Sequence, residues 1–230
     1  MDLPLKSVWK VIEENKKAGN GACNNCPLRS CRLLLLKPEG LDAVRVMVIT
    51  EGPNRPEPVE VLVSPLNHPT FTFLYTMFSG NFRPVGCGAN VYWTHVRKCF
   101  LSNRGFREGR EALRLCQNYI YHEILALKPK LIVAVGASAL KAIHRVSSDE
   151  RIRDKLESTF LRQRDEIYRE VKVEGVKFDL AVLPHPSGRN MFWNNPPEES
   201  LAALRKVMES IKGMLQERTS TLSLKHESDS

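Results

Sequence analysis

Short apolar runs alternate with helical segments along this chain, and this alternation constrains the fold more than any other feature. Four runs have the β-branched or aromatic character of buried strands, at residues 44–49, 90–96, 131–135 and 178–183. Apolar residues at helical spacing predict helices at residues 3–18, 71–78, 108–127, 136–145 and 197–215. Apolar strands that alternate with helices are typical of a parallel sheet covered on both faces. We therefore predict an α/β fold, a three-layer α/β/α arrangement with a central four-stranded, mainly parallel sheet.

The length and composition favour one domain. The chain has 230 residues, of which 42% are hydrophobic, enough to build a core and to exclude global disorder. We expect a single domain over residues 1–216, interrupted by a charged, solvated helical insertion at about 147–170. Residues 171–176 suggest a hairpin around Gly175, and residues 217–230 are expected to form a disordered tail.

The charge and the hydropathy of the chain indicate which kind of binding partner and which cellular compartment to expect. The formal net charge of +8 suits a polyanion such as nucleic acid, although many proteins reach this balance without one. The chain has no run of 18 apolar residues, and its first twenty residues lack the apolar core of a signal peptide. We therefore expect a cytoplasmic monomer with no membrane association.

Six cysteines point to a metal site. In a cytosolic chain disulfides are disfavoured, and Cys23 and Cys26 form a C-x2-C knuckle. Cys99 and Cys116, separated by 16 residues, make a plausible second pair. Four thiolates suit either tetrahedral zinc or a cubane iron–sulfur cluster. The remaining Cys31 and Cys87 are interpreted as buried apolar thiols, although in a hyperthermophile they would be able to pair with each other.

Polar residues follow three of the four predicted strands. Glu51 follows the first strand, His95 ends the second, and His185 and Ser187 follow the fourth. Ligands of open α/β sheets bind beyond the carboxyl ends of the strands. We therefore predict one polar crevice at this edge, while each residue taken alone also fits a turn or capping role.

Four short motifs follow one another along the chain. They are CNNCPL at residues 23–28, VMVITEGP at 46–53, VYWTHVRKC at 91–99 and HPSGRN at 185–190. In this order they resemble the uracil-DNA glycosylase superfamily, especially its family-four, iron–sulfur branch, over roughly residues 5–213. CNNCPL looks like that branch's CxxCPL, and VYWTHVRKC resembles its VYITNxVKC. VMVITEGP resembles the family's first motif, a strand that ends in Gly-Glu-Ala-Pro-Gly, and HPSGRN resembles its second motif in the HPSxRN form of related branches.

The resemblance implies a DNA glycosylase that hydrolyses the N-glycosidic bond of uracil or another deaminated base flipped out of DNA, in base excision repair. It implies catalytic roles for His185 and Glu51, with a structural hydrogen bond between them as the alternative. It implies a [4Fe–4S] cluster on Cys23, Cys26, Cys99 and Cys116, with zinc as the alternative. The residues predicted to contact the base are Gly52, Asn54, Leu66 and His95. Ser187 and Asn190 are predicted to contact DNA phosphates. Arg189 lies where the family has the side chain that fills the space left by the flipped base.

Several positions depart from the family pattern. His95 stands where family four has an Asn that contacts the uracil edge, and Leu66 stands where it has a stacking Phe. Thr50 and Asn54 replace glycines of the first motif. His95 alternatively packs under the cysteine-bearing helix. These departures keep a second function open, a protein of the same fold that captures a damaged base with little or no turnover.

A basic segment follows the second strand. Residues 97–114 contain two acidic and six basic residues. The basic ones are Arg97, Lys98, Arg104, Arg107, Arg110 and Arg114. The resulting local charge suits a patch that follows DNA phosphates, or else the exposed face of a helix.

Overall fold

The computed structural model describes residues 4–35, 37, 45–53, 91–101, 105–147, 149–152, 167–186, 198, 201–202 and 204–213. The strands are β1 (Val46–Thr50), β2 (Val91–His95), β3 (Leu131–Val135), β4 (Ile167–Val173) and β5 (Val176–Leu183). They form one sheet in the order β2-β1-β3-β5-β4. β2, β1, β3 and β5 pair in parallel, whereas β4 pairs with β5 in antiparallel fashion. The carboxyl ends of β1, β2, β3 and β5 therefore meet at one edge.

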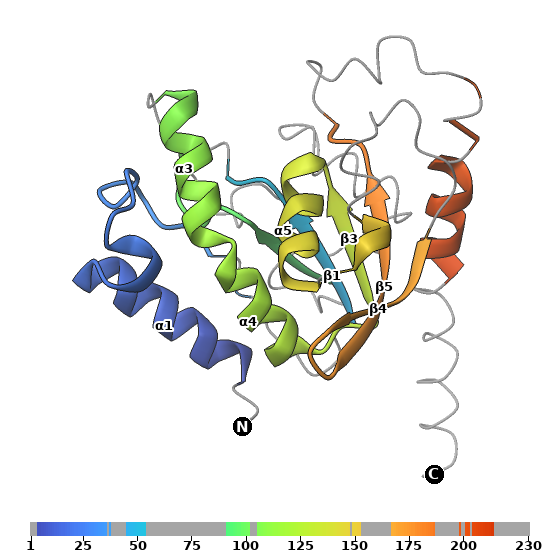
Figure 1. Cartoon of the computed structure of the whole chain (residues 1–230), viewed down its shortest axis with the longest axis horizontal. Helices are drawn as coiled ribbons and strands as arrows, with labels where there is room; N and C mark the ends of the chain where they lie inside the picture. The colour runs from blue at the N-terminus through green and yellow to red at the C-terminus, as the bar shows by residue number, and fades with distance from the viewer. Residues whose placement is uncertain are drawn as a thin grey trace, which may run out of the picture.

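Helices cover both faces of this sheet, as predicted. α1 (Leu5–Ala18), α4 (Asn118–Leu127) and α5 (Ala137–Ser147) pack on one face, while helical residues 204–213 pack on the other. Figure 1 shows the latter segment in red, across the sheet from α1 and α4. Alternate residues of each strand enter the two cores because successive side chains point to opposite faces. Met47 and Ile49 belong to the α4 side, and Val46 and Val48 to the other.

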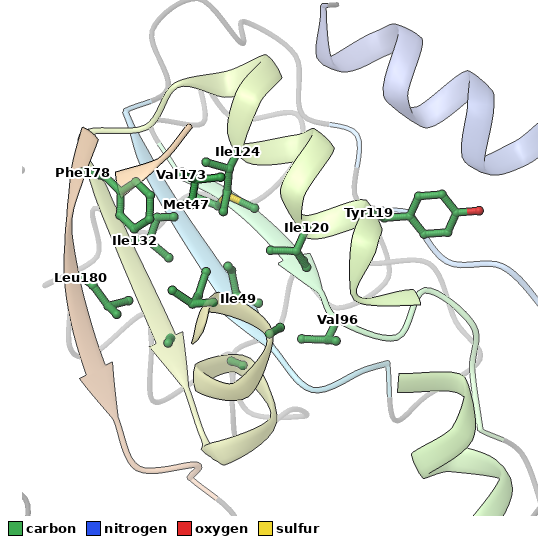
Figure 2. Packing of buried hydrophobic residues seen from close by; sticks show 14 of the residues in the cluster. Met47, Ile49, Val96, Tyr119, Ile120, Ile124, Ile132, Val173, Phe178 and Leu180 are labelled. Carbon is green, nitrogen blue, oxygen red and sulfur yellow. The ribbon is translucent and has the colours of Figure 1, made fainter. Parts of the chain in front are cut away.

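The core on the α4 side is dense and apolar. Ile120 and Ile124 of α4 meet Met47 of β1 and Ile132 of β3, and all four are fully buried (Figure 2). Tyr119, on the same helix, points away from the sheet in Figure 2, and its hydroxyl accepts a hydrogen bond from Asn15 of α1 at 3.2 Å. No helix in the described ranges is both long and apolar enough to cross a membrane.

The sheet has five strands where the sequence predicted four. The additional strand, β4, is the first arm of the predicted hairpin, and the turn at Glu174 and Gly175 joins it to β5. Residues 167–170 were expected to belong to a helical insertion, and this was wrong. Residues 167–173 place Tyr168, Val171 and Val173 in the core while the residues between them remain exposed, which is a strand pattern broken by a bulge. The tail at 217–230 and the helix predicted at 71–78 lie outside the described residues.

The helix predicted at 108–127 is instead two helices. α3 (Phe106–Cys116) ends before Gln117, and α4 begins at Asn118. At this junction the amide of Ile120 donates to the carbonyl of Gln117 at 3.0 Å, a tighter spacing than the α-helical one. The apolar periodicity continues through the junction, so the sequence pattern does not reveal it. The break leaves Cys116 at the end of its own helix.

Candidate active site and cysteine centre

Glu51 and His185 lie at the same edge of the sheet. Glu51 directly follows β1, and His185 follows β5 by two residues. β3 is the one strand between them, so β1 and β5 are about 10 Å apart. The turn after β3 passes close to His185, since a Cβ on Gly136 would lie only 3.1 Å from the Cβ of His185. Gly136 also has a φ of 88°, a conformation that glycine adopts without strain.

The charge on Glu51 influences His185. Burial lowers the pKa of His185 below its usual 6.5, and the negative charge of Glu51 opposes part of that shift. His185 is half-buried, whereas Glu51 is exposed. At neutral pH the arrangement therefore presents a neutral imidazole and a solvent-accessible carboxylate at one edge.

Ser138 holds the Glu51 carboxylate. Its hydroxyl donates to Oε2 of Glu51 at 2.8 Å from the first turn of α5. The N-terminus of a helix also stabilises a nearby negative charge. The sequence interpretation missed Ser138 because it assigned no polar residue to the end of the third strand. The signal that would have found it is the small Gly-Ala-Ser sequence between that strand and its helix.

His95 is held by its strand neighbours. The parallel register places it beside Thr50, and its Nδ1 lies 2.6 Å from the Thr50 hydroxyl oxygen. Trp93 donates its indole N–H to the same oxygen at 3.1 Å and packs edge-on against the His95 ring. His95 is only 7% exposed. Thr50 thus holds the ring through Nδ1.

Arg97 lies between the Glu51 turn and the cysteines. Its backbone N–H donates to the carbonyl of Glu51 at 2.9 Å, and its Nη1 donates to the carbonyl of Cys99 at 3.1 Å. A Cβ on Gly52 would meet the guanidinium at 2.6 to 2.8 Å. Burial lowers the pKa of Arg97, and the negative charge of Glu51 opposes part of the shift.

The predicted phosphate-binding patch is therefore wrong for two of its members. Arg97 is 4% exposed and Lys98 is 2% exposed, because both side chains turn inward where the chain leaves β2. Arg107, Arg110 and Arg114 are exposed on α3, and Arg104 lies outside the described residues.

Lys98 belongs to a buried polar network that sequence reasoning did not find. Its ammonium donates to both carboxylate oxygens of Glu123 and to the hydroxyl of Thr94, each at 2.8 Å. Glu123 also accepts from Tyr92 at 2.8 Å, and Tyr92 accepts from the indole of Trp9 at 3.1 Å. The network joins α1, β2 and α4. The only sequence signal was a lone Glu at an apolar position of the helix.

Four cysteines gather where α1, β2 and α3 meet. Cys23 ends the short helix η1 (Gly21–Cys23), Cys26 follows it, Cys99 follows β2, and Cys116 ends α3. All four are free thiols with exposures of 8% or less. Burial raises the pKa values of Cys23 and Cys99, and raises that of Cys116 to about 12. Charges on Cys26 and Cys99 would each raise the pKa of Cys116 further, which shows that the thiols are neighbours.

The donor set fits a metal centre in its chemistry. Four soft sulfur donors are gathered in one buried place. Lys16 lies beside them, and its positive charge opposes part of the rise in the pKa values of Cys23 and Cys99. Within the described ranges, no three His, Cys, Asp or Glu side chains are already close enough together to coordinate one ion. The thiols are therefore neighbours but do not form a preformed cage. Cys31, predicted to be a buried apolar thiol, is half-buried beside this group.

The remaining predicted site residues lie outside the described ranges. They are Asn54 and Leu66 for the base, Ser187, Arg189 and Asn190 for DNA, and the surplus Cys87. Of the predicted catalytic and base-binding residues, the structure brings Glu51, Gly52, His95 and His185 to one edge of the sheet.

Comparison with known proteins agrees with this geometry. The sequence profile of the family described as "Uracil DNA glycosylase superfamily" matches residues 38–212. A Type-4 uracil-DNA glycosylase from Pyrobaculum aerophilum is 25% identical over 166 residues, which cover 72% of this chain and 78% of that protein.

Proposed function

Since this chain belongs to the uracil DNA glycosylase superfamily, we propose that it is a monofunctional DNA glycosylase. It hydrolyses the N-glycosidic bond of uracil or another deaminated base in DNA, as a step of base excision repair. The observation that carries the proposal is the pairing of a neutral, half-buried His185 with an exposed Glu51 at the carboxyl edge of the sheet. A base within a duplex is inaccessible, so the nucleotide must be flipped into this edge.

His185 is proposed to stabilise the leaving base. When the glycosidic bond breaks, its electron pair moves to the base nitrogen and negative charge spreads to the base oxygens. A neutral imidazole N–H can donate a hydrogen bond to such an oxygen as that charge develops. The turn residues Pro184 and Pro186 restrict the backbone on both sides of the imidazole.

Glu51 is proposed to serve the sugar and the water. Loss of the base leaves positive charge on the sugar, which a carboxylate stabilises. The attacking water forms a bond to the sugar carbon and gives up its proton, which Glu51 accepts. Ser138 donates to Oε2 of Glu51 and fixes the orientation of the carboxylate for this role.

Further residues are proposed to contact the DNA. Gly52, Asn54, Leu66 and His95 would contact the flipped base, and Ser187, Arg189 and Asn190 would contact the strand. Arg189 would fill the space left by the base, because arginine can both stack on bases and reach phosphates. The partner is DNA that contains a deaminated base, and the protein is proposed to act as a cytoplasmic monomer.

Cys23, Cys26, Cys99 and Cys116 are proposed to hold a [4Fe–4S] cluster. Four buried thiols and the adjacent positive charge of Lys16 support this assignment. When bound, the cluster would cross-link three chain segments and would take no part in bond cleavage. Zinc is the alternative occupant, because four thiolates suit it equally.

A base-release assay tests the proposed activity. The purified protein is incubated with oligonucleotides that carry uracil, hypoxanthine or xanthine, both single-stranded and paired with different bases. We expect alkali-sensitive abasic sites with at least one of these substrates, and none with the Glu51→Gln variant. Tight, selective binding without base release would support the alternative function, a protein that captures damaged bases. If the protein neither releases a base nor binds damaged DNA selectively, both proposed functions are refuted.

His95 bears on which base is released. An Asn amide can donate and accept in one fixed orientation, whereas Nδ1 of His95 is already engaged by Thr50, so the ring cannot offer both nitrogens to the base. We therefore expect selection by fit, with weak action on uracil or action on several deaminated bases, and with mispaired sites preferred because flipping costs less there. His95→Asn should shift the substrate profile toward uracil. A wild-type protein already strict for uracil, with a variant that merely loses activity, would contradict this expectation.

A further inference from the structure

We propose that Arg97 is a positioning residue that ties the Glu51–Gly52 turn to the cysteine centre. The first observation is its place in the chain. It lies two residues after β2 and two residues before Cys99, so its backbone belongs to the segment that carries a thiol. Its backbone N–H nevertheless bonds to the carbonyl of Glu51, which belongs to the neighbouring strand's turn.

The side chain makes the same connection a second time. Nη1 donates to the Cys99 carbonyl, while the rest of the guanidinium lies flat against Gly52, so close that a methyl group there would overlap it at 2.6 to 2.8 Å. A larger residue at position 52 would therefore displace the guanidinium of Arg97 and, since the φ of Gly52 is not left-handed, that contact is what favours glycine here. One planar group therefore contacts both sites.

Stability alone does not account for this arginine. It is 4% exposed, and among the described residues its buried Nε has no hydrogen-bond partner. A buried, unsatisfied donor costs free energy, and an apolar side chain of similar length would avoid that cost. Lys98, the next residue, has three acceptors for its ammonium and needs no such explanation. The cost is understandable if the guanidinium holds the turn that presents Glu51.

A double-mutant cycle tests the contact without reference to catalysis. Gly52→Ala should lower the melting temperature and speed hydrogen exchange at the Arg97 amide, which reports the bond to Glu51. In the Arg97→Met background the added methyl meets a flexible chain, so its effect should fall to less than half. Equal effects of Gly52→Ala in both backgrounds would overturn the proposal.

The functional arm rests on the proposed glycosylase activity. Arg97→Met should slow single-turnover base release at least about tenfold, while DNA affinity stays within about twofold, because a displaced carboxylate costs rate more than binding. Arg97→Lys retains the charge but lacks the planar fork, so it should restore only part of the rate. Full recovery with Lys, or an unchanged rate with Met, would overturn the positioning role.

Controls distinguish failure of the proposed glycosylase activity from failure of the positioning role of Arg97. Arg205→Met makes the same chemical change on an exposed residue of the helical segment at 204–213, and it should alter neither exchange nor rate. If the wild-type protein releases no base at all, the glycosylase proposal fails. The exchange and melting measurements still decide whether Arg97 couples the two sites.

Discussion

At the scale of single residues, the proposed active site pairs the half-buried His185 with the exposed carboxylate of Glu51. Burial favours the neutral imidazole, and Glu51 limits how far that preference goes. A neutral donor can approach a base without adding a full positive charge to the ground state. Its hydrogen bond then strengthens as the base becomes anionic, which is the requirement for lowering the barrier.

Replacement of His185 by Ala should therefore slow catalysis far more than it weakens binding. Loss of one such donor typically costs about 10²–10³ in rate. We expect a decrease of that size in single-turnover base release, with DNA affinity nearly unchanged. The measurement needs saturating enzyme so that binding does not limit the rate. An unchanged rate would remove His185 from the mechanism.

The lowered pKa of His185 also predicts how activity and stability depend on pH. Because the folded protein resists protonation of this residue, the unfolded chain takes up the proton first as the pH falls. The contribution of His185 to the free energy of unfolding should be intact above pH 6.5 and should decline below it. Base release that depends on the neutral form should likewise persist down to pH 6.5 and fall only at lower pH.

Denaturant titrations of the wild type and His185→Gln at several pH values check the stability part. The free energy of unfolding of the wild type, relative to that of the variant, should decrease as the pH falls below 6.5. If this relative free energy increases instead, the folded protein favours the charged imidazole, which is opposite to the effect of burial.

Which residues could be predicted depended on whether chain position alone decides their surroundings. Glu51, His95 and His185 lie at or just beyond the carboxyl ends of strands, so their meeting at one edge follows from parallel pairing. The burial of Arg97 and Lys98 does not, because it depends on acceptors from Cys99 and Glu123 that folding brings near. The contacts of the Thr50 hydroxyl with Trp93 and His95 were not predictable either, because they depend on the register between β1 and β2.

At the scale of elements, β2 and α4 are joined by charge as well as by apolar packing. Lys98 and Glu123 are 2% and 0% exposed in their side chains, and the pair is satisfied on both sides by Thr94 and Tyr92. The pair fixes where the chain leaves β2, immediately before Cys99. β1, β2, β3 and β5 were predictable from their apolar runs, whereas residues 167–170 of β4 were not. The link between Lys98 and Glu123 and the α3–α4 break were also missed, because Glu123 and the break lie within an apparently continuous helical periodicity.

Glu123→Ala should therefore destabilise the fold strongly. The change leaves a buried ammonium and two hydroxyl groups without their shared acceptor, and breaking a buried pair in this way costs about 3–5 kcal/mol. Glu111→Ala removes a carboxylate from an exposed ion pair with Arg114 and serves as the matched control, with little change expected. Urea unfolding measures both. Equal stability of the two variants would show that Lys98 finds another partner.

For the molecule as a whole, we expect the cysteine centre and the central strands to contribute separately to stability. The thiols lie on the N-terminal segment, at the exit of β2 and at the end of α3, which are far apart in the sequence. The sheet has two apolar cores, built from the strands, α1, α4, α5 and residues 204–213, and Cys116 belongs to the core on the α4 side. An occupant of the centre would therefore order mainly the segments that carry the thiols, because the central strands pack against many other apolar residues.

Metal analysis and metal removal test this division. Protein purified without oxygen should contain about four iron and four sulfide ions per chain, as a [4Fe–4S] cluster requires. After removal of the metal with a chelator, hydrogen exchange should rise at residues 20–35, 97–101 and 105–116, because the cross-link between them is lost. The amides of β1, β3 and β5 should remain protected, since their fully buried side chains do not depend on the thiols. Zinc without iron would refute the cluster. Loss of protection in the central strands would show that the metal, and not the apolar core, holds the sheet together.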